Sequence, residues 1–368
     1  QEKMKIPFFT AERQNKEIGS DIKKAISKVI DSGIYSDGPN IREFEEKWSE
    51  INQVKHTVFT GSGTAALEIA LKCYGTCDSI VAVPTNTFIA SASQVFPLKR
   101  SIVEWVDSDE TCNLDIESLN HFSFETLIGV NLYGQPLDFD KLKHVLGDRE
   151  LLLDACQSHF STYKNKPVAT YAKISVFSFY TTKSLSCAGE SGCLCTDNKN
   201  WYEYAKSLRN HGRGDVGYSH DYISGNSRGE EIQAAILLGK LKQKDEIIDG
   251  RLSATSRYRK NLQDHPNIKL LPKDKNCQTI NYVMPVFVEN RDKIKEELLK
   301  AGISTMIHYP IPCHLQPAFN DCGYGVEGQF PVAEKQCKME LSLPLFYDIT
   351  NEEIDYVSGL LINVIENL

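Results

Sequence analysis

The amino-acid sequence predicts an α/β protein whose central sheet is mostly parallel. Three observations support this fold class: apolar runs rich in β-branched residues, helical patterns between them, and enough apolar residues (41% of 368) for a large core. Such alternation typically produces parallel strands with helices on both faces of the sheet. Strands are expected at residues 54–60, 80–84, 127–131, 151–153 and 174–179, and helices at residues 65–73 and 139–145.

The pattern changes after residue 201, where long amphipathic helices replace the alternation. Helices are expected at residues 230–244, 247–262, 293–301 and 352–365, with one strand at residues 282–288. We place a domain boundary near residue 246. The prediction is a large α/β domain over residues 1–246 and a smaller α+β C-terminal domain over residues 247–368.

The composition of the chain disfavours proteins that bind nucleic acid or membranes. The chain has 41 Lys+Arg against 49 Asp+Glu, and the net charge of −8 provides no general attraction for nucleic acid or an anionic membrane. No apolar run reaches the ~20 residues of a membrane helix, and the first residues lack the pattern of a signal peptide. We therefore expect a cytoplasmic protein with a small-molecule site.

The eleven cysteines are expected to be reduced thiols. They are scattered from Cys73 to Cys337 without any CxxC pair. His308 and His314 lack a nearby cysteine pair that would complete a zinc site, so no metal is expected.

The first candidate site is the segment TGSGTAAL at residues 60–67, between a predicted strand and a predicted helix. Its glycines permit a tight turn, the helix start can bind an anion, and Ser62 and Thr64 add hydroxyl groups. The same letters fit a dinucleotide fingerprint, but the next strand ends in PTN, without the acidic residue that would hold a ribose. A phosphate cup, a dinucleotide site and a structural turn all remain open from this motif.

Two further candidates stand at strand ends. Asp154 follows the apolar run LLL, and its charge needs a partner there: a cationic cofactor nitrogen, an arginine or a helix N-terminus. Lys183 follows the strand at residues 174–179, where desolvation would make its amine nucleophilic, although a lone lysine in this place is also compatible with simple solvation. A phosphate cup, a strand-end aspartate and a strand-end lysine, in this order, are the parts of a pyridoxal 5′-phosphate site.

Short motifs in a fixed order extend along nearly the whole chain. They are GP at 38–39, FEE at 44–46, GSGTAAL at 61–67, TFIA at 87–90, LYGQP at 132–136, DACQ at 154–157, SFY at 178–180, GNSR at 225–228, EIQAA at 231–235, IHYPIP at 307–312 and LSLP at 341–344. Together they resemble the DegT/DnrJ/EryC1/StrS family of pyridoxal-phosphate-dependent nucleotide-sugar aminotransferases. The resemblance implies an aspartate-aminotransferase-like fold (fold type I) with a seven-stranded central sheet, and a homodimer with shared active sites.

The resemblance also implies a role for each residue that contacts the cofactor. Lys183 would form the Schiff base and later move a proton between the cofactor carbon and the substrate carbon. Asp154 would pair with the pyridine nitrogen, Gln157 would lie near the phenolic oxygen, and Phe88 would stack on the ring. The phosphate would be held by Gly63, Thr64, Ser178 and, from the neighbouring subunit, Asn226.

The sugar pocket, by the same resemblance, would be lined by Tyr35, Arg228, His308 and Tyr309. Two structural alternatives stay open here. Arg228 is also compatible with a structural ion pair, and His308 with a buried core position that serves packing alone.

Four positions depart from the family pattern. Ser184 stands where an asparagine usually follows the lysine, Ser191 where a glycine is usual, Phe160 where a glycine commonly follows the histidine, and Cys77 where a glycine usually precedes the aspartate. These exchanges leave the cofactor contacts in place and are expected to reshape the pocket beside Lys183. A dehydratase branch of the family has histidine at the lysine position, so Lys183 argues against that activity.

The resemblance implies transfer of an amino group from L-glutamate to a keto-sugar nucleotide. The run HYPIPCHLQ at 308–316 is most similar to enzymes that act at C3 of a dTDP-linked 3-keto-6-deoxyhexose. The alternatives are amination at C4 of a UDP-, GDP- or dTDP-4-keto-6-deoxysugar, a catalytically silent relative that binds the cofactor or a sugar nucleotide, and, least supported, an NAD-dependent oxidoreductase. Lipopolysaccharide O-antigen, a glycosylated surface protein and an antibiotic sugar are all compatible destinations.

Overall fold

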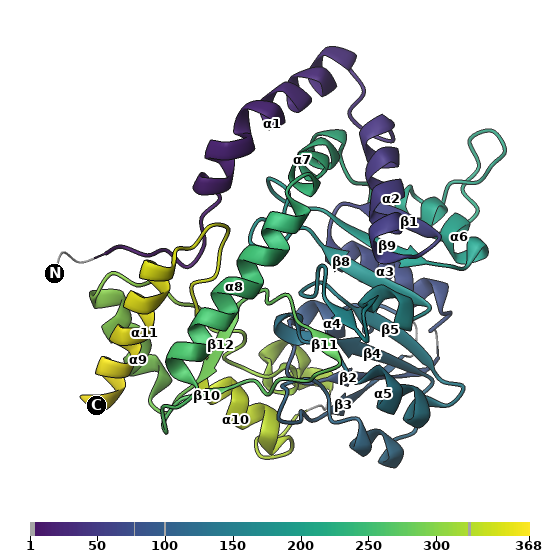
Figure 1. Ribbon diagram of the computed structural model, residues 1–368. Helices are drawn as coiled ribbons and strands as arrows, with labels where there is room; N and C mark the ends of the chain where they lie inside the picture. The colour runs from purple at the N-terminus through teal and green to yellow at the C-terminus, as the bar shows by residue number, and fades with distance from the viewer. Residues whose placement is uncertain (1–3, 77, 99–100, 323–324) are drawn as a thin grey trace.

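A seven-stranded sheet forms the centre of the computed structural model, which describes residues 4–76, 78–98, 101–322 and 325–368 (Figure 1). Its strand order is β1-β9-β8-β5-β4-β2-β3, and β9 is antiparallel to both of its neighbours while the other pairs are parallel. The strands are β1 (His56–Thr60), β2 (Ile80–Pro84), β3 (Ile102–Val106), β4 (Thr126–Val130), β5 (Glu150–Asp154), β8 (Ile174–Ser178) and β9 (Gly192–Thr196). The predicted mostly parallel α/β sheet is confirmed.

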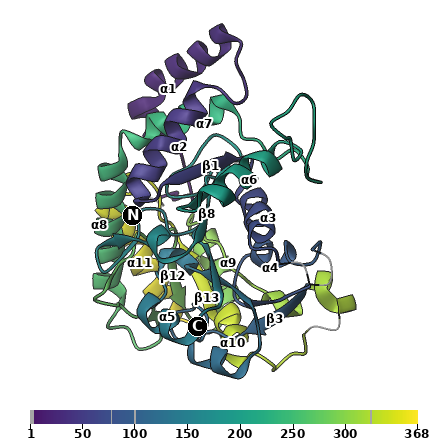
Figure 2. The same ribbon diagram turned by 90° about the vertical axis from the view of Figure 1, so that its right-hand side faces the viewer.

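Helices cover both faces of this sheet (Figures 1 and 2). The α-helices are α1 (Glu12–Ser32), α2 (Pro39–Asn52), α3 (Gly63–Cys73), α4 (Ile89–Ser93), α5 (Phe139–Leu146), α6 (Lys199–Arg209), α7 (Glu231–Leu241), α8 (Lys244–Leu262), α9 (Arg291–Lys300), α10 (Pro331–Met339) and α11 (Asn351–Glu366). Short 3₁₀ helices are η1 (Glu117–His121), η2 (Leu132–Gly134), η3 (Val168–Tyr171), η4 (Cys313–Leu315) and η5 (Pro317–Cys322).

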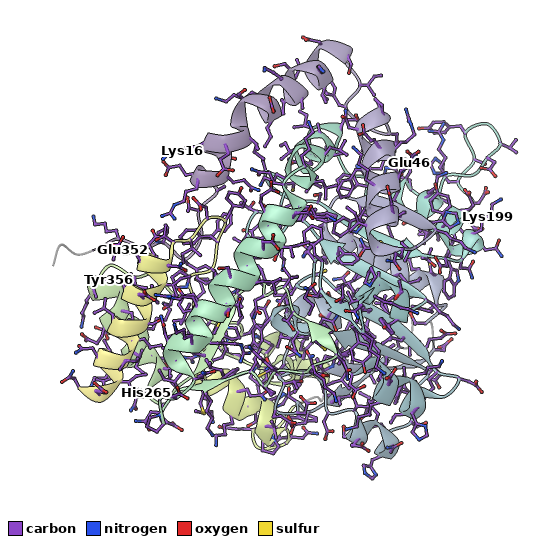
Figure 3. All side chains as sticks on the ribbon, in the orientation of Figure 1. Lys16, Glu46, Lys199, His265, Glu352 and Tyr356 are labelled. Atoms are coloured by element: carbon purple, nitrogen blue, oxygen red, sulfur yellow. The ribbon has the colours of Figure 1, made fainter. Side chains whose placement is uncertain are left out.

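The alternation of side chains along the strands divides the core into two layers. In β5, Leu152 packs in one apolar cluster with α3 and α6, while Leu151 and Leu153 pack in the other with α2, α5 and α7. Helix α2 shows the matching amphipathic pattern, since Trp48 is fully buried whereas Glu46 lies at the outer surface (Figure 3).

The sequence analysis does not predict β3, β9, α1 or α2. Strand β9 reads GCLCT and lacks the β-branched run that marks the other strands, although every residue in it is buried. Helix α1 buries only Gln14, Ile22 and Val29, and it lies beside α7 in both views. Each of these elements depends on a partner distant in sequence, which local patterning does not reveal.

The C-terminal part has its own core and a small sheet of its own, β10-β12-β13, from Lys269–Leu270, Met284–Phe287 and Glu340–Leu343. A second small sheet, β11-β6-β7, joins Cys277–Gln278 to Thr162–Tyr163 and Lys166–Pro167 of the N-terminal part. A third apolar cluster joins residues 254–361 with Ile6, which bridges to Ile303. Position 246 falls inside α8, and the boundary expected there stays a prediction.

The described residues contain no helix that is both long and apolar enough to cross a membrane. Nine cysteines whose side chains the structure describes are free thiols. Buried thiols contribute to the core as small apolar groups, as the sequence analysis expects.

Candidate active site

A cavity of about 430 Å³ opens at the carboxyl edge of the central sheet. Ligands of open α/β sheets bind at this edge because strand ends and helix starts meet there. Nine of the predicted site residues line this cavity: Gly63, Thr64, Phe88, Asp154, Gln157, Ser178, Lys183, His308 and Tyr309. The structure thus brings together residues from both halves of the chain.

The start of α3 forms an anion-binding cup on this cavity. Ser62 is the N-cap residue, and its Oγ accepts a hydrogen bond from the N–H of Ala65 at 3.0 Å. A Cβ at position 63 would lie 2.8 Å from the Cβ of Ser178 and 3.0 Å from the Sγ of Cys156, so only glycine fits. The positive end of the α3 dipole and its free N–H groups therefore meet the cavity without an intervening side chain.

Asp154 ends β5 with a buried carboxylate that lines the cavity. One oxygen accepts a hydrogen bond from Ser91 Oγ at 2.7 Å, and the other accepts one from the main-chain N–H of Cys156 at 3.1 Å. Within the described part of the chain, no lysine or arginine forms an ion pair with it. A buried carboxylate held in this way calls for a cation from a ligand.

Lys183 stands five residues after Ser178, the last residue of β8, in a tightly bonded turn. Its main-chain N–H donates to the carbonyl of Tyr180 at 2.8 Å. Its Nζ lies 4.3 Å from the ring centre of Tyr282, and no carboxylate of the described residues pairs with it. Contact with the π-face of Tyr282 holds the amine over the cavity, where it can reach a carbonyl carbon.

Gln157 is fixed by two hydrogen bonds. Its Oε1 accepts from the main-chain N–H of Tyr133 at 2.7 Å, and its Nε2 donates to the phenolic oxygen of Tyr309 at 2.9 Å. The ring of Phe88 lies 5.7 Å from that of Tyr309 and is half exposed, so its face is open to the cavity. These contacts place the amide of Gln157 and the rings of Phe88 and Tyr309 around a part of the cavity that can accept a planar ring.

Two buried histidines border the site in neutral form. Burial lowers the pKa of His159 to about 3, with the charge of Lys183 adding to the effect. The Nε2 of His159 donates to the carbonyl oxygen of Ser178 at 2.7 Å and thus fixes the end of β8. Burial, and then Lys183, lowers the pKa of His308 to about 4.

Three predicted residues lie outside this cavity. Tyr35 is half exposed, and its carbonyl accepts a hydrogen bond from the main-chain N–H of Glu231. Arg228 bonds Asn226 Oδ1 through its Nε at 3.1 Å and lies 4.0 Å from a carboxylate oxygen of Asp37. The structural ion pair left open for Arg228 is therefore present in this chain.

Three of the four departures from the family pattern have distinct structural settings, and the fourth, Cys77, lies outside the described residues. Phe160 adopts the left-handed backbone that favours glycine (φ 64°), at a cost of about 1–2 kcal/mol. Its ring packs edge-on against Trp48, 5.7 Å between centres, which offsets part of this cost. The hydroxyls of Ser184 and Ser191 are buried and have no hydrogen-bond partner among the described residues.

Sequence reasoning missed Ser91 and Tyr282, which the structure places against the reacting groups. Ser91 lies four residues after Thr87 on α4, and the spacing within TFIASAS could have placed both hydroxyls on one helix face. Tyr282 carried no comparable signal, because it reaches Lys183 only through the packing of the C-terminal part onto the sheet.

These residues fit pyridoxal 5′-phosphate. The cup at Gly63 suits the phosphate, the unpaired carboxylate of Asp154 suits a protonated ring nitrogen, and Lys183 supplies the amine that binds the aldehyde carbon. When bound, this cofactor acts as an electron sink for the carbon that carries the amino group.

The chain belongs to the DegT/DnrJ/EryC1/StrS aminotransferase family, whose profile matches residues 16–361. It is a pyridoxal-phosphate-dependent aminotransferase that acts on a sugar nucleotide. The resemblance seen in the sequence is confirmed.

Particular relatives share nearly the full length. The chain is 32% identical over 350 residues to dTDP-3-amino-3,4,6-trideoxy-alpha-D-glucose transaminase of Streptomyces venezuelae, covering 93% of this chain and 91% of that protein. It is 30% identical over 370 residues to UDP-2-acetamido-2-deoxy-3-oxo-D-glucuronate aminotransferase of Pseudomonas aeruginosa, covering 97% and 100%. DesV of S. venezuelae, solved in complex with a ketimine intermediate, superposes with a TM-score of 0.94 at 30% identity over 99% of both chains. The expected fold is confirmed.

Gly63→Ala is expected to weaken pyridoxal phosphate binding by at least about tenfold, because the new Cβ would meet Ser178 and Cys156 where the phosphate must approach. Fluorescence titration of apoprotein with the cofactor measures this change. Gly359→Ala in α11, where an added Cβ meets nothing within 4 Å, is the matched control. Equal affinity in the two variants would contradict the assignment of the cup.

Proposed function

We propose that this enzyme transfers the amino group of L-glutamate to C3 of a dTDP-linked 3-keto-6-deoxyhexose, giving a dTDP-3-amino-3,6-dideoxyhexose. The observation that carries the chemistry is that Lys183 and Asp154 share one cavity with the helix start at Gly63. Position C3 is supported by the run at 308–316 and by two relatives, a 3-amino-sugar transaminase and a 3-oxo-sugar aminotransferase.

Different residues of the site have different roles in transamination. The carboxylate of Asp154 binds a cationic nitrogen and keeps it protonated. The Nζ of Lys183, once released from the cofactor, accepts a proton from the carbon of glutamate and returns one to the carbon of the sugar. Gln157 and Tyr309, joined by a hydrogen bond of 2.9 Å, orient the phenolic side of the site.

The C-terminal part completes the pocket for the sugar. Tyr282, His308 and Tyr309 all line the cavity opposite the helix start. They present an imidazole and two phenol groups, which suit recognition of sugar hydroxyl and keto oxygens. The nucleotide would then extend away from the cavity toward solvent.

A homodimer with shared active sites is the second part of this proposal. The loop between α6 and α7 extends away from the body of the chain in both views (Figures 1 and 2). Val216, Tyr218 and Ile223 on this loop are 81%, 82% and 100% exposed, and Asn226 follows them outside this chain's own cavity. Apolar side chains so exposed are typical of an interface, here with a second copy of the chain.

The first test follows both half-reactions. Addition of L-glutamate is expected to convert the absorption band of lysine-bound pyridoxal phosphate to that of pyridoxamine phosphate, and the 3-keto sugar nucleotide to restore it. Lys183→Ala should slow both steps by about 10²–10⁴-fold, whereas Lys173→Ala, an exposed lysine paired with Glu150, should not. Restoration by a 4-keto sugar nucleotide alone would contradict amination at C3, and no response to glutamate would contradict the amino donor.

The second test addresses the dimer. Tyr218→Asp combined with Ile223→Asp is expected to shift the protein from dimer to monomer in analytical ultracentrifugation, because charges replace apolar contacts at the interface. The monomer should also retain pyridoxal phosphate less well, since Asn226 no longer reaches a neighbouring site. Leu299→Asp, at a residue 57% exposed on α9, is the control. A dimer unchanged by the double substitution would contradict the shared site.

A further inference from the structure

A buried chain of hydrogen bonds runs from the sugar side of the cavity into the C-terminal part. His308 lines the cavity, and its Nδ1 lies 2.9 Å from the Oγ of Ser342 on β13. The same Oγ lies 2.5 Å from the Oε1 of Glu340. The other carboxyl oxygen, Oε2, accepts a hydrogen bond from the main-chain N–H of His308 at 2.6 Å. None of the cofactor contacts described above involves these hydrogen bonds.

Glu340 has no cation on its carboxyl group among the described residues. The nearest guanidinium, that of Arg291 on α9, donates instead to the main-chain carbonyls of Glu340 and Cys337 and pairs with Asp292. Glu340 is fully buried. Its carboxyl group is thus held by neutral hydrogen-bonding groups alone.

Apart from the guanidinium of Arg291, which stays charged, the titratable groups named here beside Glu340 are uncharged at neutral pH. Burial raises the pKa values of Cys112 and Tyr133 well above their usual ranges and that of Cys337 to about 12. His308 itself, beside Lys183, has a pKa lowered to about 4. Between these limits only Glu340 changes its charge, since burial raises the pKa of its carboxyl to about 8.

Counting the hydrogens along this series of hydrogen bonds gives two arrangements of its protons. When Glu340 is protonated, Oε1–H donates to Ser342, the Ser342 hydroxyl donates to Nδ1 of His308, and the imidazole proton must sit on Nε2. When Glu340 is ionised, Ser342 donates to Oε1, Nδ1–H of His308 donates to Ser342, and Nε2 becomes an acceptor. All three hydrogen bonds are kept in both states: the two through Ser342 reverse direction, whereas the main-chain N–H of His308 donates to Oε2 throughout.

Nε2 of His308, which is a donor in one arrangement and an acceptor in the other, is the ring nitrogen that remains available to a ligand in the cavity. Nδ1 of His308 is bound to Ser342, whereas Nε2 has no hydrogen-bond partner within the described part of the chain and is not sealed from solvent. The rings of Phe8 and Tyr282 flank the imidazole at 5.8 Å, and Tyr309 lies at 5.3 Å. They restrict the imidazole to the orientation that Ser342 sets.

We propose that Glu340 is a positioning residue which, through Ser342, sets the tautomer of His308 and so makes Nε2–H a hydrogen-bond donor to an oxygen of the keto sugar. Ionisation of Glu340 turns the same nitrogen into an acceptor and weakens sugar binding. This inference rests on the proposed function for the identity of the ligand, whereas the tautomer of His308 is set by residues of the protein itself.

Nitrogen NMR of the holoenzyme, labelled in its histidine rings, tests the tautomer without any turnover. A His308→Gln sample assigns the signals. The wild-type enzyme is expected to show a protonated Nε2 of His308 near neutral pH and a protonated Nδ1 above the pKa of about 8 that Glu340 reaches. Glu340→Gln, whose amide can donate to Ser342 and accept from the His308 N–H, should keep Nε2 protonated throughout. Ser342→Ala should remove the switch.

Steady-state kinetics with the keto-sugar nucleotide test the consequence. Between about pH 7 and about pH 9.5 the KM of the wild-type enzyme should rise about tenfold more than that of Glu340→Gln, with similar kcat values. Glu352→Gln, an exposed residue on α11 (Figure 3), is the matched control and should follow the wild type.

The outcomes separate the two proposals. If the glutamate half-reaction proceeds but the His308 signals and the KM profile are the same in wild type and Glu340→Gln, the role of Glu340 is contradicted. If glutamate fails to react while the tautomer still switches with pH, the proposed function fails and the switch stands.

Discussion

The buried carboxylate of Asp154 is the constraint on which the rest of the site depends. Taking an ionised carboxyl group out of water is costly unless partners compensate, and among the described residues only Ser91 and the N–H of Cys156 donate to it. Under the proposed function, the ring nitrogen of bound pyridoxal phosphate would be the cation that completes this set of partners. The cofactor would then complete the electrostatics of the fold at the same point where it gains its reactivity. Lys183, held over Tyr282, is placed to use that reactivity.

The topology explains how these groups meet. Asp154 on β5 and Ser178 on β8 lie at one edge of the sheet, beside the start of α3, because parallel strands run in the same direction and end at the same edge. The C-terminal part covers this edge with Tyr282, His308 and Tyr309. Under the proposed function, the sheet edge would hold the cofactor, and the C-terminal part, which contains the hydrogen bonds from His308 to Glu340, would face the sugar.

Much of this arrangement could be predicted from the sequence, since strand ends and glycine turns are local signals. Asp154 follows its apolar run directly, and Gly63 lies in a turn that only a residue without Cβ can occupy. The contacts that tune the site could not be predicted, because they join distant segments: Ser91 reaches Asp154 across 63 positions, and Ser342 reaches His308 across 34. Strand β9 escaped prediction for a similar reason, since its small residues become a strand only between β1 and β8.

The central claim is that Asp154 keeps the cofactor nitrogen protonated. Nitrogen NMR of pyridoxal phosphate labelled at its ring nitrogen, bound to wild-type enzyme and to Asp154→Asn, tests it most directly. The account predicts a protonated nitrogen in the wild type, throughout the pH range in which the enzyme is folded, and an unprotonated one in the variant. The same protonation state in both proteins would contradict it.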